Sequence, residues 1–298
     1  MPRAGEIIVC ISRSSGGATR SQSEANAIRD AMKAAGLTGR VELVDGAGIV
    51  HRARKAAQEG AKVLIVGGGD GSVNAAAGAL VGTKTRLGIL PLGTLNHFAR
   101  DLGIPMKLEE AAKLIAEGKP RKVDVGEVNG RIFINNSAIG LYPLMVLDRD
   151  SQQKRLGRSK RLAMLVAGAR TLARFHHGRL TLTVNDEEAR VDTPLLFVGN
   201  NDYRLDIGGP GRRESLSDGA LSVFVMRKKT RRGLVAASIR ALFDRTREDD
   251  MVRLDHVQRL QVGSRRSRLH VSIDGEVVSL SPPLDYRVRR QALTVIAP

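Results

Sequence analysis

The sequence has 298 residues, a net charge of +17 and one cysteine, Cys10. This length allows two domains with a hydrophobic core each. A single cysteine excludes an intrachain disulfide and favours a reducing compartment, with Cys10 expected as a buried side chain and not as a nucleophile. No apolar run approaches the about 20 residues of a membrane-spanning helix, and the first segment is too short and too acid-interrupted for a signal peptide. We therefore expect a cytoplasmic protein.

The positive charge is uneven, with a net +6 in residues 1–124 and +11 in residues 125–298. Such a surface favours nucleic acid, anionic lipid or an anionic nucleotide as a partner. The 3% aromatic content and the lack of a recognisable binding motif argue against nucleic acid. An anionic membrane surface combined with a nucleotide fits the composition better, and we expect no nucleic-acid partner.

Residues 1–124 alternate strand-like and helix-like segments. The expected strands are Glu6–Ile11, Val41–Val44, Val63–Val66 and a short apolar run from Leu87, and the expected helices are Ser21–Ala35, Ile49–Glu59 and Leu108–Ala116. This alternation predicts an α/β domain with a doubly wound, mostly parallel sheet. Ligands of such sheets bind beyond the carboxyl ends of the strands. The turns Ser12–Gly17, Gly67–Gly71 and Leu92–Thr94 are therefore expected to converge on one cleft.

From residue 125 to residue 289, short alternating runs and turn dipeptides predict an antiparallel β-sandwich. An Asn129-Gly130 hairpin is expected at its start and an Asp274-Gly275 turn near its end. The other expected strands are Leu180–Val184, Leu195–Val198, Leu221–Met226, Val257–Val262, Leu269–Ile273 and Val277–Leu280. Helical stretches are expected at Lys160–Arg174 and Arg232–Arg245.

The first of these helical stretches, 160–174, is amphipathic. Lys160, Arg161, Arg170 and Arg174 lie opposite its apolar face at helical spacing. Two interpretations stay open: a solvated face over a helix packed on the sandwich, or a basic and apolar surface in contact with the membrane interface.

A glycine-rich turn follows the strand Val63–Val66. Gly67, Gly68, Gly69 and Gly71 carry no Cβ and can adopt φ > 0, so backbone N–H groups can close on a phosphate where Ser72 opens a helix. The pattern is neither a dinucleotide-binding G-x-G-x-x-G nor a P-loop. A tight strand-to-helix turn without a ligand is the simpler alternative, but it gives Asp70 no packing role.

Two stretches, Gly68–Asn74 (GGDGSVN) and Pro91–Arg100 (PLGTLNHFAR), together resemble the diacylglycerol kinase catalytic-domain family. This family includes bacterial lipid kinases and sphingosine kinases and is distantly related to NAD kinase. Ser15–Gly17 resembles the end of its N-P-x-S-G-G loop, Ser217–Leu221 its D-G-x-L segment, and Ile273–Glu276 its D-G-E segment. The order of these segments makes the resemblance specific and extends it over nearly the whole chain.

The resemblance implies a nucleotide-binding domain 1–124, to which a last strand at 290–298 returns, and a lipid-substrate domain 125–289. It implies an ATP- and Mg²⁺-dependent kinase that acts on a lipid hydroxyl, peripherally at the inner face of the membrane. Phosphoryl transfer needs a phosphate cradle, a cation and a carboxylate near the acceptor. Glu276 is expected as the general base, Asp70 as the catalytic residue of the nucleotide–metal site and Asp218 as a further metal residue. The expected ATP-binding residues are Ser15, Gly16, Gly68, Gly69, Gly71, Ser72, Asn74, Gly93, Thr94 and Asn96.

Two positions depart from the family pattern: Ala75 stands where many relatives have Glu, and His97 where they have Asp. His97 could weaken metal binding or could contact phosphate when protonated. Three alternatives therefore stay open: an NAD kinase-like enzyme with a soluble substrate, a pseudoenzyme, and a regulator that binds nucleotide or nucleic acid without catalysis. The sequence does not identify the lipid, and it is compatible with a homodimer.

Overall fold

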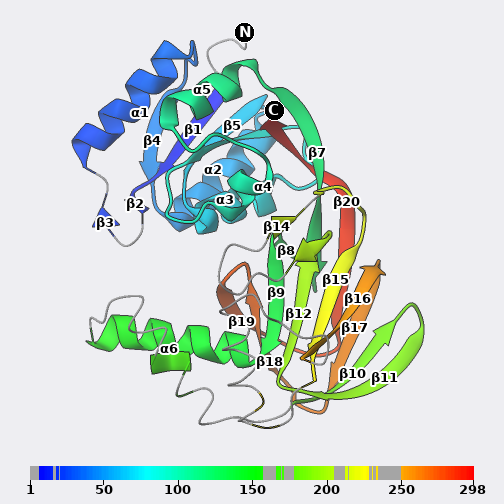
Figure 1. Ribbon diagram of the computed structural model, residues 1–298. Coiled ribbons are helices and arrows are strands. Elements are labelled where there is room, and N and C mark those ends of the chain that lie inside the picture. Colours follow the sequence, from blue (N-terminus) through cyan, green and yellow to red (C-terminus); the bar gives the residue numbers. More distant parts are fainter. Residues whose placement is uncertain are drawn as a thin grey trace. The chain divides into compact units, whose positions relative to one another are not determined.

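The computed structural model describes residues 7–15, 18–19, 21–156, 166–168, 170, 178–204, 212–213, 215–227, 230, 233 and 250–298. The chain divides into two compact units, which are labelled by element in Figure 1. Unit 1 comprises residues 1–125 and 289–298, and unit 2 comprises residues 126–288. Strands β7 (Lys119–Val128) and β20 (Leu284–Ala297) each continue from one unit into the other.

Unit 1 has a parallel sheet with the strand order β20-β6-β5-β1-β4. Its strands are β1 (Ile7–Ser12), β4 (Arg40–Val44), β5 (Val63–Gly68), β6 (Arg86–Pro91) and the end of β20, with a small hairpin of β2 (Ser14–Ser15) and β3 (Ala18–Thr19). Its helices are α1 (Gln22–Ala34), α2 (Gly46–Gln58), α3 (Asp70–Leu80), α4 (His97–Asp101) and α5 (Leu108–Glu117). Helix α1 packs with α5, and α2 packs with α3. The predicted doubly wound α/β domain is confirmed.

Local capping sets where the helices of unit 1 begin. Ser21 and Glu24 form a capping box at the start of α1, and Gly36, with φ of 72°, follows its C-cap. Helix α2 begins three residues before the predicted Ile49, because the Asp45 carboxylate accepts a hydrogen bond from the Gly48 N–H at 2.7 Å.

The core of unit 1 contains the only cysteine of the sequence. Cys10 has no exposed surface in β1, and burial raises the pKa of its thiol to about 11. The expectation of a buried side chain is confirmed. Each residue of β5 is buried as well, which explains why this strand is a continuous apolar run and not an alternating one.

Unit 2 is an antiparallel β-sandwich. One sheet has the order β16-β15-β12-β9-β18-β19, and the other runs β11-β10-β17-β20, with the hairpin β7-β8 beside β20. The strands are β8 (Arg131–Phe133), β9 (Asn136–Gly140), β10 (Gly178–Val184), β11 (Glu187–Thr193), β12 (Leu195–Asn200), β15 (Leu221–Met226), β16 (Met251–Val257), β17 (Arg259–Ser264), β18 (Leu269–Ile273) and β19 (Glu276–Leu280). A short ladder joins β13 (Tyr203–Arg204) to β14 (Arg212–Arg213), and helix α6 covers Leu141–Leu156.

Apolar side chains from both sheets of unit 2 form one core. Tyr286 of β20 lies fully buried in it, and its hydroxyl lies 3.0 Å from the Ser137 hydroxyl of β9 in the opposite sheet. This hydrogen bond satisfies two polar groups that burial would otherwise penalise. The predicted antiparallel sandwich is therefore confirmed.

Both predicted hairpin turns of unit 2 are present. Asn129 and Gly130 have φ of 46° and 80°, and Asp274 and Gly275 have φ of 47° and 86°. Positive φ at both central residues is the geometry of a type I′ turn, which Asn-Gly and Asp-Gly favour.

Several predicted boundaries were wrong. Val257–Val262 was expected to be one strand, but β16 ends at Val257 and β17 begins at Arg259. His256, just before this break, has φ of 56°, which is uncommon for a residue other than glycine. The sequence analysis also missed β9, β11 and α6. Strand β11 reads EEARVDT with exposed polar residues on both faces, and α6 has no marked amphipathic period.

The two predicted helical stretches fall mostly outside the described residues. Within Lys160–Arg174 the structure describes helix at 166–168 and at 170, and within Arg232–Arg245 it describes residue 233. Arg170 is exposed, and its guanidinium pairs with the Asp148 carboxylate of α6 at 3.4 Å. Lys160, Arg161 and Arg174 lie outside the described part of the chain.

Candidate active site

Two glycine turns of unit 1 meet where the parallel strands β5 and β6 end. The strands pair up to Gly68 and Pro91, and the Leu92 N–H donates to the Gly68 carbonyl at 3.0 Å. A Cβ at Gly93 would lie 2.4 Å from the Cα of Gly69, far inside any real contact. Glycine is therefore required at position 93 so that the two backbones can touch.

The first glycine turn does not use the positive φ that glycine permits. Gly67, Gly68, Gly69 and Gly71 all lack positive φ. Gly67 and Gly68 belong to β5, and a Cβ at Gly68 would lie 2.6 Å from the Cβ of Ser72 and 3.3 Å from that of Ser12. Gly67 and Gly68 thus serve close approach between segments and not an unusual backbone angle.

Helix α3 begins at Asp70, two residues earlier than predicted, with Gly69 as its N-cap and no side-chain cap. The N–H groups of Ser72 and Val73 donate to the Gly69 carbonyl at 3.0 and 3.1 Å. The N–H groups of Asp70 and Gly71 come earlier in the first turn, where helix geometry supplies no carbonyl partner. A helix N-terminus of this kind favours phosphate, both through its amides and through its dipole.

The second glycine turn is held from within by Asn96. Its side-chain oxygen accepts from the Gly93 N–H at 3.0 Å, and its NH₂ group donates to the carbonyls of Gly93 and Pro91 at 2.9 and 3.3 Å. Asn96 is buried and has φ of 52°, which Asn tolerates better than most residues. These bonds make Asn96 a positioning residue for the turn, while Thr94 on the same turn is exposed.

Asn74 provides an independent sign of a ligand. It lies one helical turn after Asp70, and both polar atoms of its side chain are buried with no hydrogen-bond partner among the described residues. Leaving a buried amide unsatisfied costs about 1–3 kcal/mol, so such a group indicates a water or ligand partner. Together with the helix N-terminus and the touching turns, this amide fits the phosphates of a nucleotide.

In unit 2, Asp274 fastens the turn that carries Glu276. The Asp274 carboxylate accepts backbone N–H bonds from Ile134 at 2.8 Å, from Asn135 at 2.9 Å and from Asn136 at 2.9 Å. The Asp274 N–H donates in return to the Asn136 carbonyl at 2.9 Å. The turn between β18 and β19 is thereby locked to the start of β9, and Glu276 stands exposed as the first residue of β19.

A buried arginine supports the same segment. The Arg213 guanidinium donates to the Asn135 side-chain oxygen at 2.8 Å and to the Ile134 carbonyl. Burial raises the pKa of Asp274 to about 6, while the three backbone N–H groups and the charge of Arg213 act in the opposite direction. The sequence indicated Asp274 as a turn residue and as part of the D-G-E segment, but not as an acceptor for these bonds, because the N–H donors lie about 140 positions earlier in the chain.

Asp218 lines a cavity of about 490 Å³ in unit 2, together with Asp202, Arg253 and Asp255. Its carboxylate accepts from the Asp202 N–H at 3.2 Å, and Arg253 pairs with the carboxylates of Asp202 and Asp255. Across the described residues, no three His, Cys, Asp or Glu side chains are grouped to hold a metal ion. Mg²⁺ is commonly held by one or two carboxylates plus substrate phosphates, so Asp70 needs no preformed cluster for its predicted role.

The structure thus groups many of the predicted nucleotide-binding residues in unit 1 around the two turns. Ser15 belongs to the β2–β3 hairpin, and Gly16 lies outside the described residues. Asp70 is in unit 1, whereas Asp218 and Glu276 are in unit 2.

Family models match both halves of this arrangement. The diacylglycerol kinase catalytic domain matches residues 6–128, and the YegS C-terminal NAD kinase beta sandwich-like domain matches residues 146–297. The chain therefore belongs to the diacylglycerol kinase catalytic-domain family of lipid kinases.

Individual relatives agree with this assignment. The chain is 32% identical over 242 residues to a probable YegS-like lipid kinase of Chromohalobacter salexigens, covering 78% of this chain and 75% of the relative. It is 26% identical over 238 residues to the diacylglycerol kinase of Bacillus subtilis, covering 78% and 77%. A solved structure of a putative diacylglycerol kinase from Bacillus anthracis superposes with a TM-score of 0.77 at 24% identity, covering 98% and 97%, which shows a shared fold.

The glycine turns generate a first prediction. A Cβ at Gly71 would have no protein atom within 4 Å, so Gly71→Ala should leave the unfolding free energy unchanged or slightly higher. Because that space is where a phosphate would approach the first turn of α3, ATP affinity should fall about tenfold or more, as measured by calorimetric titration. Unchanged affinity in a folded Gly71→Ala protein would rule out close phosphate approach there. Gly93→Ala is the contrasting variant, and it should destabilise unit 1 because its Cβ meets backbone.

A second prediction concerns the titration of Asp274. Because its pKa in the folded protein, about 6, lies above the ordinary value of 3.8, the folded state holds the proton over that interval. Its contribution to stability is fully present below pH 4 and is lost as the pH rises to 6, by roughly 3 kcal/mol in all. The stability of the wild type relative to Asp274→Asn, from urea denaturation at pH 4, 5 and 6, should therefore decrease with pH. A relative stability that instead increases over this interval would show that the N–H groups and Arg213 dominate.

Proposed function

We propose that the protein is an ATP- and Mg²⁺-dependent kinase that transfers the γ-phosphate to a hydroxyl group of a membrane lipid. The observation that carries this proposal is the contact between the Gly69 and Gly93 turns at the N-terminus of α3, with the unpaired Asn74 amide one turn further on. Backbone amides, a helix dipole and a buried amide at one place form a phosphate cradle. ATP bound there would supply the phosphoryl group, and Mg²⁺ would neutralise charge on its phosphates.

The residues of unit 1 have separate tasks in this proposal. The N–H groups of Asp70 and Gly71 and the exposed hydroxyl of Thr94 bind phosphate oxygens. The Asp70 carboxylate, partly buried in the first turn of α3, holds the metal ion. Asn96 keeps the second turn in shape through its three hydrogen bonds. Positioning and charge stabilisation of this kind supply most of the catalysis in phosphoryl transfer.

Glu276 serves as the general base in unit 2. Its exposed carboxylate can accept the proton of the acceptor hydroxyl, and the Asp274 bonds to residues 134–136 fix the turn on which it stands. A base held on a rigid turn loses little conformational entropy when the substrate arrives. Asp218 has no direct contact with this turn among the bonds described, and its metal role stays a prediction.

The alternatives differ from this proposal in the molecule that receives the phosphoryl group, or in having no such molecule. An NAD kinase-like enzyme would phosphorylate a soluble substrate, and a regulator would bind nucleotide or nucleic acid without turnover. The names of the relatives, a probable lipid kinase and a diacylglycerol kinase, favour the lipid. Within the described residues, no helix combines the length and the apolar character needed to cross a bilayer. The proposal therefore assigns the protein a peripheral role at the membrane, with the lipid coming to it from the bilayer.

The direct experiment incubates the purified protein and Mg²⁺ with ATP labelled in the γ-phosphate. Separate reactions contain a total cellular lipid extract, NAD or duplex DNA. The proposal predicts label in a chloroform-soluble product that needs Mg²⁺. Label in NAD instead would favour the soluble-substrate alternative, and binding to ATP or DNA with no labelled product would favour the regulator.

A third prediction separates the roles of the two carboxylates. Glu276→Gln keeps the shape of the side chain but removes the proton acceptor, so turnover should fall about a hundredfold or more while ATP affinity barely changes. Asp70→Asn should lower turnover and also shift the Mg²⁺ dependence, because the lost group positions the metal. Turnover, ATP affinity and a Mg²⁺ titration on both variants test this. Near-normal turnover in Glu276→Gln would remove Glu276 from the mechanism and leave Asp70 as the better candidate for the base.

A further inference from the structure

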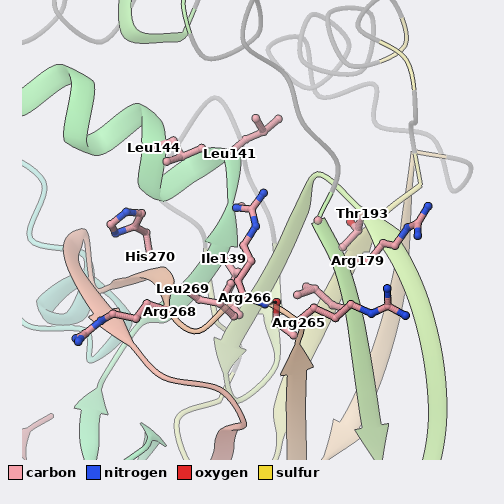
Figure 2. Close-up of a pocket in the computed structure, with 14 residues that line it drawn as sticks. Ile139, Leu141, Leu144, Arg179, Thr193, Arg265, Arg266, Arg268, Leu269 and His270 are labelled. Carbon is pink, nitrogen blue, oxygen red and sulfur yellow. Dashed lines mark hydrogen bonds between the residues drawn. The ribbon is translucent and has the colours of Figure 1, made fainter.

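A cationic cavity of about 300 Å³ lies in unit 2, away from the Glu276 turn and not used by the proposed reaction. It is enclosed by the first turn of α6, the start of β10 and the loop between β17 and β18 (Figure 2). Its lining includes Arg179, Arg265, Arg266, Arg268 and His270. Among the described residues that line it there is no Asp or Glu. The cavity is therefore suited to an anion.

The arginines of the β17–β18 loop supply most of this charge. Arg265, Arg266 and Arg268 occur within four positions, and all three are exposed. Arg268 is held in place, since its guanidinium donates to the hydroxyl and the carbonyl of Ser279, both at 3.0 Å. Arg179 lies opposite Asp192 in the β10–β11 ladder, which offsets part of its charge. Arg265 and Arg266 are thus the side chains most directly offered to a ligand.

Apolar side chains adjoin the same cavity. Leu144 of α6 lines it and is 45% exposed, and Leu147, three positions on, is 39% exposed. Residues at this spacing share one face of a helix. Figure 2 shows Leu141 and Leu144 on α6 beside the cavity that the arginine side chains surround. Among the described residues, the other large exposed hydrophobic side chain is Leu95 of unit 1.

We propose that this docking face, formed by Arg179, Arg265, Arg266, Arg268, Leu144 and Leu147, binds the surface of a bilayer that contains anionic phospholipids. Guanidinium groups match phosphate oxygens in charge and in hydrogen-bond geometry, and leucines beside them can enter the acyl region. A nucleic acid would use the arginines but gains nothing from exposed leucines. The combination of both residue types in one place favours the membrane.

This inference rests on the proposed function, because a kinase with a lipid acceptor must reach a substrate that stays in the bilayer. The inference adds an anionic membrane as the partner and names the residues that contact it. Each arginine near an anionic surface contributes about a fivefold gain in membrane affinity, so loss of two should weaken binding about 25-fold. The electrostatic part should also weaken as salt shortens the screening length.

The test is vesicle co-sedimentation of the full chain without nucleotide, on equimolar phosphatidylglycerol and phosphatidylcholine and on phosphatidylcholine alone. Arg265→Gln with Arg266→Gln should reduce affinity for the anionic vesicles about 25-fold. The matched control, Arg131→Gln with Arg190→Gln, removes the same charge from exposed positions of unit 2 that do not line the cavity, and should change affinity less than threefold. Thermal unfolding confirms that each variant is folded.

A second double variant tests the two leucines of the docking face. Leu144→Gln with Leu147→Gln keeps helix propensity and charge, and it should weaken vesicle binding while leaving the salt dependence unchanged. The proposal is overturned if Arg265→Gln with Arg266→Gln and the matched control lose the same affinity for anionic vesicles. It is also overturned if the wild type binds neutral and anionic vesicles equally well. A third contradicting result is an arginine variant that loses affinity for duplex DNA but keeps its affinity for vesicles.

The test of the docking face and the test of the proposed kinase function can give separate results. Kinase activity on a short-chain lipid dispersed in detergent should be the same in the wild type and in the arginine pair, since no bilayer must be bound. If the wild type binds anionic vesicles through the docking face but phosphorylates no lipid, the proposed function fails and the docking face stands. If lipid is phosphorylated but the arginine pair binds vesicles like its control, the docking face fails alone.

Discussion

The contact between two backbones at Gly69 and Gly93 is the constraint on which the proposed nucleotide site of unit 1 depends. Parallel pairing of β5 with β6 up to Gly68 and Pro91 brings the turns to the same edge of the sheet. Only the absence of a Cβ at Gly93 then allows them to touch. The helix N-terminus at Asp70 and the loop held by Asn96 follow directly from this contact. The proposed phosphate cradle consists of backbone amides at this place.

In unit 2 the corresponding feature is a short turn that holds one exposed carboxylate. Asp274 fixes this turn by accepting hydrogen bonds from the backbone N–H groups of residues 134–136, and Arg213 donates a hydrogen bond to the same segment. The two carboxylates on either side of Gly275 therefore differ. Asp274 is hydrogen-bonded and positions the turn, while Glu276 is exposed, as the proposed base must be.

Many strands, helices and turns of the fold could be predicted from the sequence, because apolar periodicity and Asn-Gly or Asp-Gly dipeptides reflect local conformational preferences. The β5 run, the α1 cap at Ser21 and both hairpin turns are of this kind. What the sequence could not supply depends on distant partners. Gly93 needs its space because of Gly69, and Asp274 finds its donors far away in the chain. Strand β11 was missed because an exposed edge strand carries no apolar alternation.

In the proposed function, backbone amides of the two glycine turns bind the phosphates of a nucleotide. The backbone amide NMR signals of the ¹⁵N-labelled protein can be followed as ATP and then Mg²⁺ are added. The largest shifts are expected at Asp70, Gly71 and Thr94, and the side-chain NH₂ signal of Asn74 should shift with them. If ATP binds while these four signals stay unchanged, the phosphates lie elsewhere and the proposed phosphate cradle is ruled out.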